Sequence, residues 1–190
     1  MWPLILENID YIIAIFTTLF AVAGMQFKSM RIILVSQIIA NGLLATQAII
    51  GGTASASITV FVAIVQTVIS FVYTSSGKGF PIWLTSIFIV VYTAVTIVCF
   101  KTGFDLLILF AAVFFALAVV QKKSSICRFC SLVNCLLWLS YDIAVMPSGI
   151  ITHVVIVSFT LAAIIRLDRG EWKSLLTKVF TKNKNSEEIE

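Results

Sequence analysis

The sequence has little charge and few of the residues that chemistry in a soluble enzyme would need. Only 12% of its 190 residues are charged, against about a quarter in soluble domains. It contains one histidine and three prolines. It has no nucleotide-binding loop, metalloprotease helix or serine-nucleophile elbow. These absences exclude a soluble globular domain, and we expect a protein that is not an enzyme and uses no cofactor.

Cysteine is scarce as well, and its spacing does not predict a metal site. Cys127 and Cys130 form a C-x-x-C pair, and two further cysteines lie elsewhere in the chain. A metal site needs more ligands, and neither a second pair nor a nearby histidine supplies them. We therefore interpret the pair as small apolar side chains and expect no metal.

Apolar residues dominate instead, in long uninterrupted runs. Hydrophobic residues form 60% of the chain, and the mean hydropathy is +1.08. A spanning helix needs roughly 20 mostly apolar residues, and continuous runs favour helices over the alternating strands of a barrel. The N-terminus carries acidic residues and lacks a basic region, so we expect no cleavable signal peptide. The runs predict seven transmembrane helices, at residues 9–25, 32–50, 54–73, 80–100, 104–120, 129–145 and 149–167.

The basic residues predict an orientation. If the N-terminus lies outside and the helices alternate, twelve of the thirteen basic residues fall inside and only Lys101 falls outside. This asymmetry follows the positive-inside rule. We expect a multi-pass protein of the bacterial cytoplasmic (inner) membrane with a cytoplasmic C-terminus. The net charge of +4 then reflects topology, so the expected partner is the lipid bilayer and not nucleic acid.

Residues 170–190 form a separate segment of different composition, an amphipathic and polar cytoplasmic tail. Lysines occupy one side of this segment, and apolar side chains occupy the other. The pattern predicts a short helix on the inner leaflet, with docking to a partner protein as the alternative. The apolar stripe consists of Trp172, Leu175, Leu176, Val179 and Phe180.

Two parts of the sequence are similar at an offset of 93 residues. The similarity predicts a first three-helix repeat at 1–77, a linker helix at 78–103 and a second three-helix repeat at 104–169. A single linker helix gives both repeats the same orientation, as in transporters that bind solute near the bilayer midplane between parallel repeats. The alternative is a duplication that only builds a stable bundle. The informative pairs are Asn41–Asn134, Thr59–Thr152 and Thr67–Thr160.

The repeated segments resemble those of known membrane protein families. They read "NGLLATQAIIGGTASASI" and "NCLLWLSYDIAVMPSGII", and the second is followed by a helix that ends in "IIRLDR". The plan is similar to that of the SWEET and SemiSWEET (PQ-loop, MtN3-like) transporters, and more closely to the bacterial YgjV inner membrane family. The resemblance covers roughly residues 9–169. It implies an all-α fold of seven transmembrane helices in a 3+1+3 arrangement.

Polar side chains inside the predicted helices are candidates for substrate binding because they are costly in lipid. Residues three or four apart share one face of a helix, which groups several of these side chains into stripes. Asparagine offers both donors and acceptors to a neutral solute, and the aromatic rings could stack on a ring of the solute. The candidates are Gln37, Asn41, Gln66, Asn134, Trp138, Tyr141 and His153.

Each candidate also has a purely structural interpretation. The amides could link helices through interhelical hydrogen bonds, which we favour for Gln37 and Gln66. The aromatic residues could anchor the outer interface. His153 could relay protons because histidine changes charge near neutral pH, although a neutral histidine bonded to a neighbouring helix is the simpler expectation. Asp142 is expected at the outer end of its helix, in contact with water.

The sequence therefore predicts a transporter of a small neutral polar solute, sugar-like or nucleoside-like. We expect facilitated diffusion through a cavity between the repeats, because no acidic residue is predicted deep within a helix to carry a proton or a sodium ion. The alternative is a non-transporting membrane scaffold or regulatory protein, and a membrane-embedded enzyme is less favoured. The sequence leaves open whether the protein forms a homo-oligomer.

Overall fold

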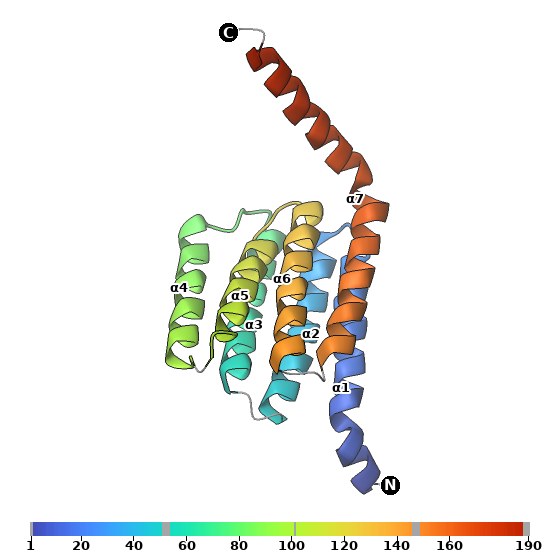
Figure 1. The fold of residues 1–190 in the computed structure, drawn as a ribbon, viewed down its shortest axis with the longest axis vertical. Coiled ribbons are helices and arrows are strands. Elements are labelled where there is room, and N and C mark those ends of the chain that lie inside the picture. Colours follow the sequence, from blue (N-terminus) through green and yellow to red (C-terminus); the bar gives the residue numbers. More distant parts are fainter. Residues whose placement is uncertain (1, 51–53, 101, 146–148, 188–190) are drawn as a thin grey trace.

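The computed structural model describes residues 2–50, 54–100, 102–145 and 149–187, with side chains omitted at 2–7, 10, 54–55 and 171–187. Within these ranges the chain forms seven helices and no strand, which confirms the all-α prediction (Figure 1). The helices are α1 (Trp2–Met25), α2 (Met30–Ile50), α3 (Ala54–Ser75), α4 (Ile82–Val98), α5 (Asp105–Val119), α6 (Ser124–Val145) and α7 (Ile150–Glu187).

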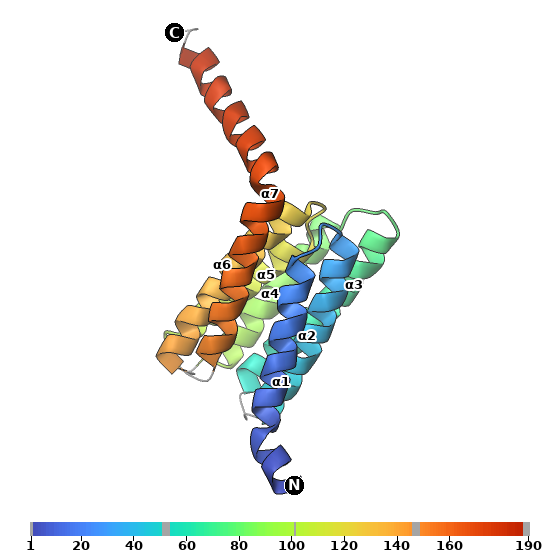
Figure 2. The ribbon, with the colours of Figure 1, turned by 90° about the vertical axis from the view of Figure 1, so that its right-hand side faces the viewer.

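The helices lie where the apolar runs predict them, and the main difference is at the C-terminal end. The tail does not form a separate helix, because α7 continues through Gly170 to Glu187. A single glycine without a following proline is tolerated in a helix. The second half of α7 projects beyond the bundle (Figures 1 and 2). The side chains of the predicted apolar stripe, including Trp172 and Phe180, lie outside the described residues, so its membrane contact stays a prediction.

Several helices have the length and composition of membrane spans. Four are long and apolar enough to cross a bilayer, at Met30–Ile50, Ala56–Ser75, Ser124–Val145 and Ile150–Gly170. Three shorter apolar helices accompany them, including Asp105–Val119, whose length of about 22 Å is less than the ~30 Å of a bilayer core. The described residues therefore form a helical membrane protein.

The six helices other than α4 form a closed ring of neighbours. α2 packs against both α1 and α3, and α6 packs against both α5 and α7. The contacts between α1 and α7 and between α3 and α5 join the two groups. α4 packs against α3 and α5, at one side of the bundle (Figure 1).

Apolar side chains cover the outside of the bundle, and polar side chains lie within it. Asn41, Gln66 and Thr160 are buried, at 8%, 0% and 0% exposure. A soluble protein exposes few large apolar patches, whereas a bundle in lipid places its polar groups inward. Each helix exposes large apolar residues, among them Phe16, Val35, Phe61, Val90, Phe110, Leu136 and Ile165.

Basic residues gather at one end of the bundle. The α1–α2, α3–α4 and α5–α6 connections lie there, beside the point where α7 leaves the bundle (Figure 1). Arg31 donates from Nη2 to the carbonyl oxygen of Ser75 at 3.3 Å, and the Lys122 side chain lies against Gly79. We call this end the basic end. Lys101 lies outside the described residues.

A buried ion pair ties three elements together at the basic end. Arg128 of α6 donates to both carboxylate oxygens of Asp168 in α7, from Nε at 2.8 Å and from Nη2 at 2.5 Å. Its Nη1 donates to the carbonyl oxygen of Phe27, between α1 and α2, at 2.7 Å. The two charged side chains are only 1% and 2% exposed. Because this arginine of α6 bonds both to α7 and to the α1–α2 connection, it joins these three elements at the basic end.

Replacing Arg128 with methionine should strongly destabilise the protein. Asp168 would be left as a buried charge without its partner, which costs about 3–5 kcal/mol. The measurement is thermal unfolding of the purified protein in detergent. Arg31→Met is the matched control because Arg31 is exposed, and Arg128→Met/Asp168→Leu should recover much of the loss. Equal melting temperatures for Arg128→Met and Arg31→Met would contradict this role.

Candidate functional site

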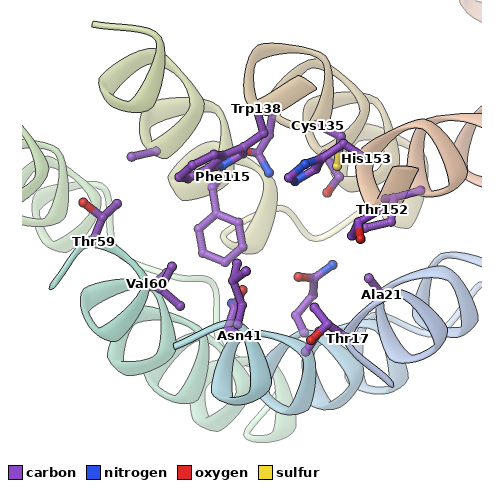
Figure 3. A pocket seen from close by; sticks show the side chains of 18 of the residues that line it. Thr17, Ala21, Asn41, Thr59, Val60, Phe115, Cys135, Trp138, Thr152 and His153 are labelled. Carbon is purple, nitrogen blue, oxygen red and sulfur yellow. The ribbon is translucent and has the colours of Figure 1, made fainter. Parts of the chain in front are cut away.

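A cavity of about 90 Å³ lies in the middle of the ring of helices (Figure 3). A buried water needs about 10–15 Å³ on this scale, so the cavity has room for several waters or for one small solute. It is smaller than the 300–1,000 Å³ typical of sites for drug-sized ligands. All seven helices contribute side chains to its lining.

The structure brings five of the seven predicted site residues together around this cavity. The five come from three helices, α2, α6 and α7, which are distant in the sequence. Thr59 and Thr152, which align at the offset of 93 residues, line the cavity too. The five are Gln37, Asn41, Asn134, Trp138 and His153.

Gln66 and Tyr141 lie outside the lining. Gln66 is fully buried, accepts a hydrogen bond from the Tyr92 hydroxyl at 3.0 Å and donates to the carbonyl oxygen of Ala116 at 3.3 Å. It thus links α3 to α4 and α5, the structural role we favoured for it. Tyr141 packs edge-on against Trp138, with ring centroids 5.8 Å apart, so it supports a lining residue.

The two asparagines line the cavity, and each has one buried amide atom without a partner. Nδ2 of Asn41 and Oδ1 of Asn134 are buried and have no hydrogen-bond partner among the described residues. Asn41 as a whole is 8% exposed. Leaving a buried polar atom unpaired costs about 1–3 kcal/mol, so both side chains are incompletely hydrogen-bonded. One atom is a donor and the other an acceptor, and they come from matched positions of α2 and α6.

Aromatic rings form another part of the lining. The Phe115 ring projects toward the middle of the cavity, between Asn41 on one side and Trp138 on the other (Figure 3). Aromatic faces next to amide groups suit a solute with an apolar ring face and hydroxyl or amide edges. No charged Asp, Glu, Lys or Arg side chain is among the described residues that line the cavity, which suits a neutral solute.

A carboxylate–imidazole pair at the edge of the cavity was missed from the sequence. Oδ2 of Asp142 lies 2.5 Å from Nδ1 of His153. The imidazole ring also stacks on Trp138, with 6.1 Å between centroids and 4° between planes. Asp142 lies near the end of α6 and His153 lies near the start of α7. Because the connection between these helices is short, their positions in the sequence could have predicted that the two side chains meet.

Our expectation that Asp142 is in contact with water was wrong. Its side chain is 0% exposed, because it packs against Gly149 just before α7 and against His153 in the first turn of α7. The N-terminus of a helix favours a negative charge. Asp105 and Asp168 are buried as well, at 8% and 1% exposure, although Asp105 begins α5 and Asp168 lies at the basic end.

The cysteines of the C-x-x-C pair lie in α6 as free thiols. Cys127 and Cys130 are both buried, and Cys127 belongs to the apolar cluster at the basic end together with Met25 and Ile33. The part of the chain that the structure describes contains no group of three or more His, Cys, Asp or Glu side chains that could hold a metal ion. The cysteines thus occupy apolar packing positions.

An apolar exterior, buried polar groups and several long apolar helices define a polytopic helical membrane protein. The Imp-YgjV family of bacterial inner membrane proteins matches residues 8–171. The chain belongs to this family, which places it in the bacterial inner membrane. It matches no curated protein and no solved structure. The resemblance to the SWEET transporters stays a prediction.

Replacing Gly149 with alanine should disrupt the carboxylate–imidazole pair. The added Cβ would overlap the Asp142 carboxyl group and would lie 2.6 Å from its Cγ. Overpacking of this kind costs about 1–3 kcal/mol, which should lower the melting temperature. Gly103→Ala is the matched control, because Gly103 also precedes a helix and its Cβ would meet nothing within 4 Å. Equal melting temperatures of the two variants would show that the packing of Asp142 against Gly149 does not contribute to stability.

Proposed function

We propose that the protein is a transporter that binds a small neutral polar solute, sugar-like or nucleoside-like, in the central cavity. The observation that carries the proposal is that Asn41 and Asn134 line one cavity and that each has an amide atom without a hydrogen-bond partner among the described residues. A neutral polar ligand would exchange hydrogen bonds with these two amide groups, which offer both donors and acceptors. The protein would move this solute without altering it chemically.

Two parallel three-helix repeats around the cavity form the second part of the proposal. α1–α3 would be one repeat, α5–α7 the other, and α4 the linker. The pattern of neighbours supports this assignment. In two equivalent repeats, α1 corresponds to α5 and α3 corresponds to α7. A contact between α1 and α7 then requires an equivalent contact between α5 and α3, and both contacts are present. The solute would then bind on the axis that relates the repeats.

Movement of one repeat against the other would expose the cavity to alternate sides. Polar contacts currently hold α1 to α7 near the basic end. Gln26 donates from Nε2 to the carbonyl oxygen of Phe159 at 3.2 Å, and Arg166 donates to Oε1 of Gln26 at 2.8 Å. Together with the contact from Arg128 to Phe27, these bonds would have to break before the cavity opens toward the basic end.

The test of the binding site uses the apolar isosteres Asn41→Leu and Asn134→Leu, combined in one variant. Because the replaced amide atoms have no partner in the structure, leucine should leave the melting temperature unchanged or raise it. In wild type, a solute that binds only the folded protein raises the melting temperature, and this increase should vanish in the variant. The measurement is a thermal-shift screen of purified protein against sugars and nucleosides. Thr46→Val/Ser140→Ala is the control, since both residues are exposed on the same two helices.

Uptake of the stabilising solute into liposomes would separate transport from binding alone. Wild type and the control variant should take up the solute in a saturable manner and release it chemically unchanged, and the leucine variant should not. If the leucine variant instead unfolds far below wild type, the asparagines are interhelical links. A scaffold or regulatory role would then be the better account.

We also propose seven spans with the N-terminus outside and the basic end in the cytoplasm. The support is the gathering of the α1–α2, α3–α4 and α5–α6 connections at the basic end, in line with the positive-inside rule. A green fluorescent protein fused after Glu190 should fluoresce, and alkaline phosphatase at the same point should be inactive. Alkaline phosphatase fused after Thr102, in the α4–α5 connection, should be active. The reverse pattern would invert the topology.

A further inference from the structure

Asp142 and His153 form a pair whose total charge depends on one proton. With a neutral imidazole the pair carries one negative charge, and with one proton added it carries none. Asp142 is fully buried, and its Oδ1 has no hydrogen-bond partner among the described residues. An uncompensated buried charge is strongly unfavourable. The geometry therefore gives the imidazole a reason to hold a second proton, on Nε2, beside the one that lies in the 2.5 Å contact between Oδ2 and Nδ1.

The pair is connected to the cavity through His153. The imidazole lines the cavity and stacks on Trp138, which lines it as well (Figure 3). Nδ1 faces Asp142, so Nε2 is the ring nitrogen through which a proton would pass to or from the cavity. Asn134 lies four residues before Trp138 on α6, so the site that would bind solute and the site that would bind a proton share one helix face.

Few other ionisable groups surround the pair. Tyr141 of α6 packs against Trp138 and interacts electrostatically with both Asp142 and Asp105, which begins α5. Cys135 of α6 lines the cavity too. From α1 the described lining residues are Thr17, Ala21 and Met25, none of which is charged. The side chains of Glu7 and Asp10 lie outside the described residues.

We propose that Asp142 and His153 form a proton-binding site that couples proton movement to solute movement. This inference rests on the proposed transport function and replaces the facilitated diffusion that the sequence suggested. In the loaded state Nδ1–H of the imidazolium donates to the Asp142 carboxylate and Nε2 also carries a proton. On release, the Nε2 proton goes to water in the cavity and no other bond is made or broken. A change in charge beside the cavity would alter its affinity for solute, and by linkage solute would alter proton binding.

The proton site can be tested on the wild-type protein without any solute. His153 is the only histidine of the chain, so histidine labelled with ¹³C at ring Cε1 gives a single NMR signal in nanodiscs. We expect this signal to move when the pH is varied over a range on both sides of neutrality, as the imidazole gains or loses its proton. A signal that stays constant over this range would overturn the proposal, because the site would then never exchange its proton.

Two carboxylate variants provide the matched comparison. In Asp142→Asn the imidazolium loses its charge partner, so a smaller fraction of His153 should be protonated at a given pH than in wild type. Asp105→Asn, which removes the other buried carboxylate at the same end, should leave the titration close to that of wild type. Identical titrations of Asp142→Asn and wild type would overturn the assignment of the pair as one site.

Coupling is tested by uptake into liposomes, with radiolabelled glucose and uridine as probes. In wild type, an imposed proton gradient should change the initial rate of uptake by about five-fold or more. Asp142→Asn should lose this response, and Asp105→Asn should keep it. Uptake that ignores the gradient in wild type overturns the coupling and leaves the transport function standing. No uptake of either probe, with or without a gradient, counts against both.

Discussion

The absence of water around the sides of this bundle is the constraint on which the rest of the structure depends. In lipid a polar side chain cannot be satisfied from outside. Exposed hydroxyls such as those of Thr46 and Ser140 donate to carbonyl oxygens of their own helix, whereas the amides of Asn41, Gln66 and Asn134 turn inward. Gln66 finds two partners and links α3, α4 and α5. Asn41 and Asn134 each keep an unpaired atom, and both lie at the central cavity. The same requirement therefore produces structural links between helices at some polar positions and unpaired polar atoms at others.

Charge is distributed unequally between the two halves that the internal similarity relates. α6 and α7 are joined by the Arg128–Asp168 pair near the basic end and by the Asp142–His153 pair near the other end. At the offset of 93 residues, the positions that correspond to these four are Val35, Ser75, Ile49 and Val60, none of them ionisable. Asn41, Thr59 and Thr67 have identical counterparts in the second half, whereas both ion pairs found among the described residues lie in the second half. On the proposed function, the second half would bind the proton and both halves would bind the solute.

Much of the fold follows from apolar runs and breaks, because the length of an apolar run decides whether it can form a span. The predicted helix at 129–145 is the C-terminal part of α6, which begins earlier, at Ser124, and includes the buried Arg128 with its bonds to Asp168 and Phe27. The prediction of a separate tail helix was wrong because Gly170 does not interrupt α7. For the site, helical spacing correctly grouped Gln37 with Asn41 and Asn134 with Trp138 at one cavity. Gln66 was favoured as an interhelical link, and its partners Tyr92 and Ala116 come from other helices, which spacing within one helix does not specify.

The sequence by itself determined that this is a membrane protein of several helices, because composition and run length depend only on the order of residues along the chain. It also indicated that amide side chains within the spans, such as Asn41 and Gln66, would be enclosed, because lipid disfavours them. Only the tertiary structure decided which of those residues share a cavity and which of them pair. Asp142 illustrates the difference: its position near a helix end predicts contact with water, yet the adjoining start of α7 brings Gly149 and His153 against it. Burial of that kind results from the packing between helices, and the spacing of residues within one helix does not specify it.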